Sequence, residues 1–341
     1  MFNLFKRKPI FSFIPGVHKS YNTQSDWLTM KAITPIDRSK LHGIIGIEED
    51  FDFPIIHQFG PYCTGAAARY LQIYWQYKET GKITDLSALY SYKMNKTLDG
   101  LPPGTEGSTM KASADVLRIF GICREILFPT TQANYDSGVL SETIHKDAYT
   151  NRIESYTRNN LLDEILASLN ARKPVLFGML LTESFLRTSD GVVPKEVSGN
   201  LMGGHAMLAV NADMERELVK APQSWGRGHP TKNGYMYIPF SWFETVIDNL
   251  FPLLMDSYTC LDYVPEAYQQ LPQTITVMQQ AVRVEVNGQE VKGYRIPPFL
   301  AKELEATMLH VRTFEIVFAA ILNRPVEVAW DQDTYTVKIN V

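Results

Sequence analysis

Cysteine is scarce in this sequence. Three cysteines, Cys63, Cys123 and Cys260, lie far apart in 341 residues. An odd number at such spacing provides neither a disulfide framework nor a Cys-x-x-Cys pair for metal binding or redox chemistry. A reducing compartment therefore fits the chain best.

The sequence also lacks an excess of charge of either sign. Lys and Arg total 33 against 37 for Asp and Glu, so the net charge is -4 and the pI is near 6.0. Proteins that bind nucleic acid or an anionic membrane usually carry a basic balance or a basic patch. We therefore expect neither as a partner.

Long apolar runs are missing as well. The longest candidates are short stretches such as residues 175–181, well below the ~20 apolar residues that span a bilayer. Prolines interrupt the apolar stretch of residues 1–15, and no small-residue cleavage site follows it, so we expect no secretory signal peptide. We predict a protein without a transmembrane segment that is cytoplasmic or associated with a particle such as a virion.

The chain does have enough apolar material for a large core. It is 45% hydrophobic and 21% charged, and its length leaves room for two domains of about 100–200 residues each. The composition shifts between Pro265 and Pro272. We predict an irregular leader, a first domain, a linker and a small second domain, at residues 1–34, 35–264, 265–279 and 280–341.

The first domain should belong to the α+β class. Helical periodicity and end signals predict helices at residues 63–80, 86–96, 110–120 and 161–171. Beyond residue 174, short apolar runs between turn signals predict antiparallel strands at residues 175–180, 205–210 and 235–239. A helical half should thus face a sheet half. Residues 130–160 are weakly patterned, and the residues before 50 should run along the surface with one short strand at 43–47.

The second domain should be a small α+β unit. Residues 281–291 alternate strictly between apolar and polar and contain Asn287-Gly288, the strongest short-range signal of a β-hairpin. An amphipathic helix at residues 312–322 and two strands at 326–330 and 335–340 should follow.

Cys63 is the first candidate for chemistry. It lies between the turn Gly60-Pro61 and a run of small residues, 65–68, that opens a helix. The partial positive charge of a helix N-terminus favours the thiolate, which is the nucleophilic form of cysteine. A free cysteine is also among the most buried residue types and usually acts as a small hydrophobe, so this stretch alone favours a structural role.

A candidate base lies 142 positions later. Gly203 and Gly204 precede His205 at the start of an apolar run, and two glycines let the backbone approach another element closely. Alone, His205 would be interpreted as a histidine satisfied within the sheet. The stretch Gln223-Ser224-Trp225-Gly226 then adds a side-chain amide 18 positions further on.

In this order of motifs, residues 35 to 262 resemble the papain-like, C1-type cysteine peptidases, particularly bacterial and viral members without disulfides. In that family a cysteine, a histidine about 130–150 residues later and an amide side chain meet only in the fold. The resemblance implies that Cys63 is the nucleophile and His205 the general base, and that the two rest as an ion pair. It implies that Gln223 orients the imidazole.

The resemblance also implies supporting roles for five further residues. Gln58 matches a glutamine whose amide completes the oxyanion hole with the backbone N–H of the nucleophile, a donor typically worth about 2.7–4 kcal/mol. Gly107 and Ser108 fall where the family hydrogen-bonds an extended peptide backbone. Gly204 and Trp225 complete the substrate-binding set, and Trp225 would shield the histidine from water.

Three departures from the family pattern predict reduced activity rather than none. Gln223 stands where the family has asparagine, and its extra methylene displaces the amide unless the backbone compensates. The interval from Gln58 to Cys63 is one residue shorter than usual. Tyr62 and Thr64 flank the nucleophile where better-known members carry a small residue and an aromatic one. The orienting residue matters less than the nucleophile and the base in such triads.

Residues 280 to 341 resemble a different family, the copper amine oxidase N-terminal-like or stalk domain. The stretches that carry the resemblance are VEVNG, PPFL, VRTFEI and VEVAWD, which start at Val284, Pro297, Val311 and Val326. That domain is an accessory module common on cell-envelope proteins of Gram-positive bacteria and their phages, and it carries no copper site. His310 is the only histidine here, so we expect no copper centre, and no metal or cofactor is required.

The leading hypothesis is a cysteine peptidase that hydrolyses peptide bonds in a peptide or protein substrate, with the C-terminal domain anchoring it to an assembly or a cell envelope. The alternative is a catalytically weakened papain-like module that serves as a structural or binding component of a phage tail or another particle. Gln223 and the short interval after Gln58 favour that alternative, whereas Cys63 and His205 favour the peptidase. An amidase or transferase that uses the same thiol is a third hypothesis.

Overall fold

The computed structural model describes residues 16–19, 34–49, 51–247 and 251–262, and four strands within residues 283–340. The chain divides into two compact units, Met1–Tyr263 and Val264–Val341. The predicted division into leader, first domain, linker and second domain stays a prediction.

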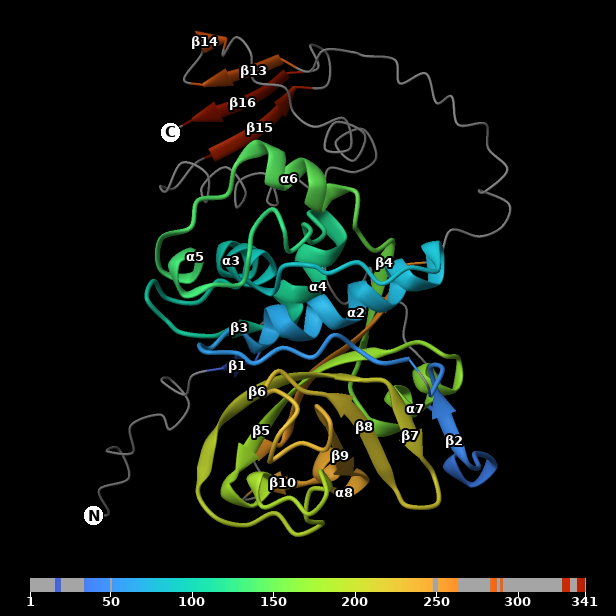
Figure 1. Ribbon diagram of the computed structural model, residues 1–341. Helices are drawn as coiled ribbons and strands as arrows, with labels where there is room; N and C mark the ends of the chain where they lie inside the picture. Colours follow the sequence, from blue (N-terminus) through green and yellow to red (C-terminus); the bar gives the residue numbers. More distant parts are fainter. Residues whose placement is uncertain are drawn as a thin grey trace, which may run out of the picture. The chain divides into compact units, whose positions relative to one another are not determined.

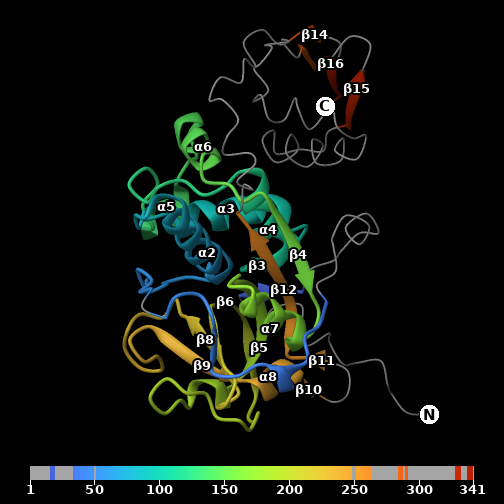
Figure 2. The same ribbon diagram turned by 90° about the vertical axis from the view of Figure 1, so that its right-hand side faces the viewer.

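The first unit has a helical half and a sheet half, as the α+β prediction states (Figures 1 and 2). The helical half contains α2 (Cys63–Thr80), α3 (Ala88–Leu98), α4 (Met110–Ile119), α5 (Gln132–Ser137) and α6 (Glu142–Tyr149).

The sheet half is built from two four-stranded antiparallel sheets. One has the order β4-β12-β5-β6, with β4 (Ser155–Asn159), β12 (Leu254–Leu261), β5 (Val175–Thr182) and β6 (Leu201–Ala209). The other has the order β2-β7-β8-β9, with β2 (Ile44–Gly46), β7 (Asn211–Asp213), β8 (Leu218–Pro222) and β9 (Tyr235–Pro239). This half also contains the helices α7 (Leu162–Asn170) and α8 (Phe240–Glu244) and the 3-10 turns η1 (Arg38–Lys40) and η2 (Glu183–Leu186). It is completed by the short strand pair β10 (Val246–Ile247) and β11 (Phe251–Pro252).

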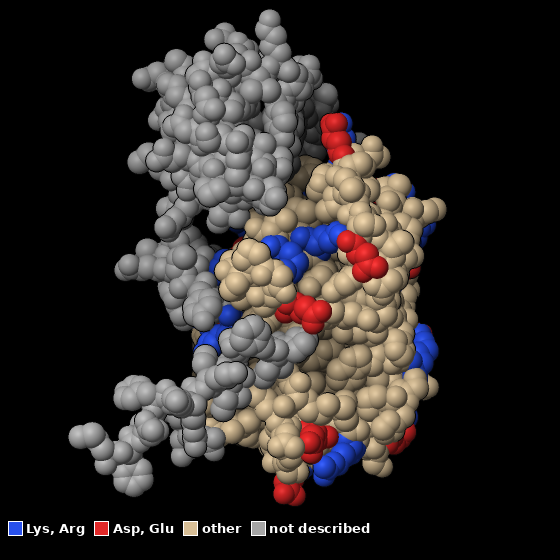
Figure 3. Space-filling view, turned by 90° about the vertical axis from the view of Figure 1, so that its left-hand side faces the viewer, with Lys and Arg blue, Asp and Glu red and all other residues tan. Residues whose placement is uncertain are grey.

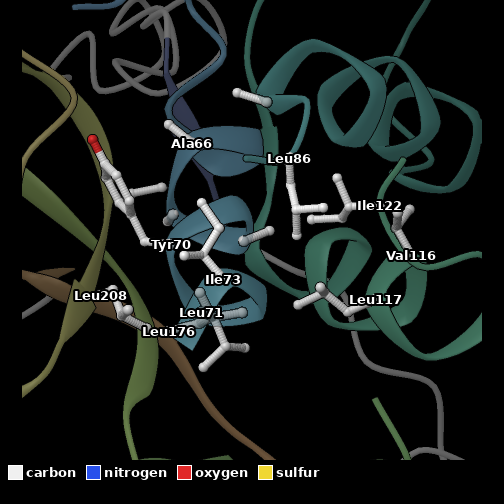
Figure 4. Close-up of a cluster of buried hydrophobic side chains, with 14 of the residues drawn as sticks. Ala66, Tyr70, Leu71, Ile73, Leu86, Val116, Leu117, Ile122, Leu176 and Leu208 are labelled. Carbon is white, nitrogen blue, oxygen red and sulfur yellow. The ribbon is translucent and has the colours of Figure 1, made fainter. Parts of the chain in front are cut away.

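Helix α2 is the central element of the first hydrophobic core. All of its first 13 residues are buried, because small side chains open the helix and large apolar ones follow. At Gly65 an added Cβ would lie 2.3 Å from the carbonyl oxygen of Ala88, so only glycine permits this approach of α2 to α3. Gly81, with φ of 69°, ends the helix in the left-handed conformation. Figure 4 shows the apolar side chains of α2 between the sheet strands and the other helices.

Most predicted elements of the first unit are confirmed within two or three residues at their ends, except that β6 begins four residues earlier than predicted. Thr109 caps α4 by accepting a hydrogen bond from the Ala112 N–H. The interpretation of residues 130–160 was incomplete, because α5, α6 and β4 lie there. Helices α5 and α6 have six and eight residues, and only Ile144 and Ala148 of them are buried. Such short helices carry little periodicity.

The second unit is described through the backbone of four strands. They form a sheet of order β14-β13-β16-β15, from β14 (Gln289–Glu290), β13 (Arg283–Val286), β16 (Thr336–Asn340) and β15 (Glu327–Asp331). The antiparallel pairing of β13 with β14 confirms the predicted hairpin, and β15 and β16 confirm the two later strands. The predicted helix at 312–322 lies outside the described residues.

Charges of both signs share the surface of the first unit. On the face drawn in Figure 3, Lys and Arg side chains lie next to Asp and Glu side chains among uncharged residues. No helix in the described part of the chain combines the length and the apolar character that crossing a bilayer requires.

Candidate active site

Cys63 is the first residue of α2, and its side chain is buried with 1% exposure. Its sulfur accepts hydrogen bonds from backbone N–H groups of Ala206, in β6, and Thr64, in the first helical turn. The thiol thus lies at the helix N-terminus, as predicted, and directly against the strand that carries His205.

His205 is buried within β6, at 4% exposure. Its Nε2 atom lies 3.1 Å from Oε1 of Gln223. The indole of Trp225 stacks on the imidazole with ring centroids 4.2 Å apart and planes 21° from parallel. The chain therefore brings together the cysteine, histidine, amide and tryptophan that were singled out in the sequence.

Gln223 follows the last residue of β8 and is fully buried. Its backbone N–H donates to the Gly234 carbonyl at 2.8 Å, and its Nε2 lies 3.4 Å from the Ala221 carbonyl. The distance to His205 is that of an ordinary hydrogen bond. The backbone thus compensates for the extra methylene, and the orienting contact is made by the longer side chain.

Gln58 precedes the nucleophile in a loop that pairs with the tryptophan segment. Its backbone N–H donates to the Ser224 carbonyl at 2.6 Å, and its Oε1 accepts a hydrogen bond from the Ser224 hydroxyl. Its Nε2 donates to the Gly60 carbonyl at 2.9 Å. An amide nitrogen carries two N–H donors, and this bond within the short loop uses one of them.

Gly107 and Ser108 lie beside a piece of the leader. Strand β1 (Val17–His18) pairs in parallel with β3 (Ser108–Thr109), and the Ser108 N–H donates to the Gly16 carbonyl at 2.9 Å. Figure 1 shows β1 between the helical half and β6. The residues that the resemblance assigns to a substrate backbone thus hold a backbone of the same chain.

Gly204 faces this segment from the sheet side. A Cβ at Gly204 would lie 2.1 Å from the Val17 carbonyl oxygen, so the double-glycine stretch permits a close approach, as predicted. Val17 is 3% exposed, and its side chain lies against Gly178 in β5, with Met110 beside that glycine. The prediction that the leader runs along the surface is therefore wrong for residues 16–17, because a valine between two glycines of the facing strands can be buried.

Burial in this conformation opposes the predicted ion pair. Burial raises the pKa of Cys63 to about 11, although N–H groups of Ala206 and Thr64 oppose the rise. Burial lowers the pKa of His205 to about 4, and the bond to Gln223 opposes that fall. Both shifts favour the uncharged thiol and the uncharged imidazole, because the closed surroundings disfavour either charge.

Sequence reasoning missed three contacts. One is the contact of residues 16–18 with Ser108 and Gly204, and the others are made by the hydroxyls of Ser224 and Tyr70. Gly16 has a φ of 120°, and a Pro-Gly-Val stretch is a signal for an extended segment with such a residue, but no local pattern shows what that segment binds. Ser224 belongs to the recognised motif, yet its bond to Gln58 depends on the fold. The Tyr70 hydroxyl donates to the Gln223 carbonyl at 3.0 Å, but Tyr70 lies in a helix whose sequence pattern shows only an apolar position there.

A metal site is not evident in the part of the chain that the structure describes, because no group of three or more His, Cys, Asp or Glu side chains there could hold an ion.

Comparisons with known proteins identify the fold. A scan against protein-family models and a search of curated proteins return no match for this chain. Xylellain, a cysteine protease from Xylella fastidiosa, is similar in structure with a TM-score of 0.61 at 20% identity, over 76% of this chain and 100% of that one. The Amb a 11 cysteine protease, a ragweed pollen allergen solved in its proform, gives a TM-score of 0.51 at 17% identity, over 72% of this chain and 77% of that one. The chain thus has a papain-like fold.

Proposed function

We propose that this protein is a cysteine peptidase that hydrolyses peptide bonds in peptide or protein substrates. The observation that supports it most is the contact of the α2 N-terminus with β6, which places the Cys63 sulfur on the Ala206 N–H while the adjacent His205 bonds Gln223. A thiol at a helix N-terminus beside an oriented imidazole is the arrangement that nucleophilic thiol catalysis needs.

In the proposed reaction, His205 takes the proton of Cys63, and the thiolate attacks the carbonyl carbon of the scissile bond. The C–N bond breaks, the imidazolium gives its proton to the leaving amine, and an acyl-enzyme remains. A water molecule, deprotonated by His205, then cleaves the thioester and releases the acid. Gln223 holds the imidazole, and the Cys63 N–H with the free N–H of a reoriented Gln58 would stabilise the oxyanion.

The conformation described is a latent one in this proposal. Residues 16–18 occupy the place on Ser108 and Gly204 that an extended substrate would need, so a substrate has to displace them. Their removal would admit water and the substrate to the thiol and the imidazole. The two pKa values should then move back toward each other, because burial is the main cause of both shifts.

A catalytically weakened module is the second candidate function. The burial that opposes charge on Cys63 and His205 favours it, and so does the glutamine in place of asparagine. In either case, we propose that the C-terminal unit, which resembles the stalk domain, anchors the protein to a cell envelope or a particle, with the protein itself cytoplasmic or virion-associated.

The test is the rate of Cys63 alkylation by iodoacetamide as a function of pH, together with hydrolysis of a fluorogenic peptide library. Under conditions that release residues 16–18, Cys63→Ala should abolish hydrolysis, and His205→Ala should remove the reactivity of the thiol below its ordinary pKa of about 8.5. Unchanged alkylation in His205→Ala, with no hydrolysis by the wild type under any condition that releases residues 16–18, would favour the module.

A further inference from the structure

Tyr70 lies two helical turns after Cys63 on the same helix and is 1% exposed. Figure 4 shows its ring at the edge of the buried cluster, with the hydroxyl oxygen directed away from Leu117 and Ile122. The ring is thus part of the core, and the hydroxyl reaches out of it.

The hydroxyl makes two buried hydrogen bonds. It donates to the backbone carbonyl of Gln223 at 3.0 Å and accepts from the backbone N–H of Ile56 at 3.0 Å. A hydroxyl can donate once and accept at the same time, so both bonds form together. A side chain of the nucleophile helix therefore holds the backbone of the residue that bonds His205.

These two backbone groups lie at opposite ends of a short antiparallel pairing. The Gln58 N–H donates to the Ser224 carbonyl, the Gly226 N–H donates to the Ile56 carbonyl, and His57 pairs with Trp225. The carbonyl of Gln223 and the N–H of Ile56 fall just outside these pairings. Buried backbone groups need partners, and Tyr70 supplies one to each.

Holding the backbone of Gln223 matters more for the position of its amide than it would for a shorter side chain. Gln223 has three side-chain torsions, and its Nε2 has only a long contact of 3.4 Å to the Ala221 carbonyl. The position of Oε1 therefore depends on where the backbone is held, between the Gly234 carbonyl that accepts from its N–H and the Tyr70 hydroxyl that donates to its carbonyl.

We propose that Tyr70 is a positioning residue that holds Gln223 in hydrogen-bonding distance of His205, so that one rigid helix fixes both the nucleophile and the partner of the base. This inference deepens the proposed peptidase function and rests on it only for its kinetic consequence. The geometric consequence concerns the imidazole and can be measured without catalysis.

The experiment compares Tyr70→Phe, Gln223→Ala and the double variant in the full chain. The first readout is the pKa of His205 from NMR titration of its imidazole, because the bond from Gln223 favours the charged form. We expect Tyr70→Phe to lower that pKa in the wild-type background and to leave it unchanged in the Gln223→Ala background. The second readout is peptide hydrolysis, where kcat should fall about tenfold, since small misplacements near reacting groups can cost up to about a hundredfold, while KM stays within about twofold.

Tyr90→Phe is the matched control. Tyr90 is also fully buried, and its hydroxyl lies 3.0 Å from Nδ1 of His145, so that variant loses one buried hydrogen bond that involves none of the site residues. It should change thermal stability but neither the His205 pKa nor the ratio of kcat to KM.

Two results would overturn the inference: a His205 pKa in Tyr70→Phe equal to that in Tyr90→Phe, or an equal effect of Tyr70→Phe in both backgrounds of the double-mutant cycle. A shifted pKa without any hydrolysis by the wild type would instead leave Tyr70 as the positioning residue and reject the peptidase.

Discussion

Gln223 contacts His205 with a side chain one methylene longer than the asparagine of the related pattern. Its Oε1 lies 3.1 Å from the imidazole, and the backbone around it is held at both of its polar groups. An acceptor at this place selects the tautomer and rotation of the ring rather than forming bonds to a substrate. In the proposed peptidase, the departure from the pattern therefore concerns the orientation of His205 and leaves the identity of Cys63 and His205 unaltered.

Replacing Gln223 with alanine should weaken catalysis without abolishing it. We expect kcat/KM for peptide hydrolysis to fall about 10- to 100-fold, equivalent to about 1.4–2.7 kcal/mol of transition-state stabilisation, because the imidazole loses the hydrogen bond with Gln223. Gln132→Ala, which removes an exposed glutamine bonded to Asp136, should have no effect. Complete loss of hydrolysis, with folding intact, would contradict an orienting role.

The identity of these residues could be predicted from the sequence, whereas their charge state could not. Cys63, His205 and Gln223 follow one another in a recognisable order, and the fold brings them together. The resting ion pair was expected from the resemblance to the papain-like peptidases. Burial opposes that charge state, and the contact of Val17 with Gly178 and Gly204 is a further feature that no local pattern reveals.

At the scale of elements, displacing β1 should have the largest effect on the reactivity of the Cys63 thiol. Val17→Asp would bury an unpaired carboxylate, which costs several kcal/mol, so the segment should leave its place on β3. We expect Cys63 alkylation near pH 7 to accelerate at least about tenfold, the equivalent of about 1.4 kcal/mol, and its midpoint to fall well below the value of about 11 that burial imposes.

The sign of that pH shift follows from the thiol. A raised pKa means that the reactive thiolate is populated only at high pH, so release from burial must move the alkylation profile toward lower pH. Val139→Asp, at an 83% exposed position, is the control and should leave the profile unchanged. A profile for Val17→Asp that matches the control would mean that residues 16–18 do not limit access to the thiol.

The packing of α2 on α3 gives a prediction about stability. Gly65→Ala would place a methyl group 2.3 Å from the Ala88 carbonyl and 2.8 Å from the Tyr92 nitrogen. Because backbone atoms of α3 cannot yield as a side-chain tip can, we expect a loss of about 1–3 kcal/mol in the free energy of unfolding, measured by urea denaturation. Gly228→Ala is the control, since a Cβ there meets nothing within 4 Å; equal stability of the two variants would show that the helices can separate freely.

Helix α2 illustrates which elements could be predicted. Its bounds follow from the small residues after Cys63 and from Gly81, and both lie where periodicity and end signals place them. Helices α5 and α6 escaped prediction because they bury few side chains and are held by local caps from Thr131 and Ser141. Strand β8 was not predicted because LVKAP contains one β-branched residue and no aromatic one, whereas the equally short YMYIP of β9 contains two tyrosines and an isoleucine.

At the scale of the whole first unit, the end of β12 meets the end of α2 through carboxyl groups. Asp262 follows β12, accepts a hydrogen bond from Nε2 of Gln72 at 3.1 Å, and interacts with Glu79 of α2 and with Glu154 just before β4. Burial, the negative charge of Glu79 and that of Glu154 together raise the pKa of Asp262 to about 7. Three elements of both halves thus converge on a carboxyl group that is costly to ionise.

The stability of the unit should therefore depend on pH through Asp262. Below the ordinary aspartate pKa of about 3.9, the folded and unfolded states both hold the proton. Between that value and about 7 the unfolded state releases it and the folded state keeps it, so the free energy of unfolding falls as the pH rises and stays low above 7.

The variant Asp262→Asn can still accept the hydrogen bond from Gln72 but cannot ionise. We expect it to raise the free energy of unfolding, measured by urea denaturation, by roughly 1–3 kcal/mol near pH 8 and by less near pH 5. The control is Glu196→Gln at an exposed position, which should change the free energy of unfolding little at either pH. A variant whose advantage grows as the pH falls would refute the assigned ionisation.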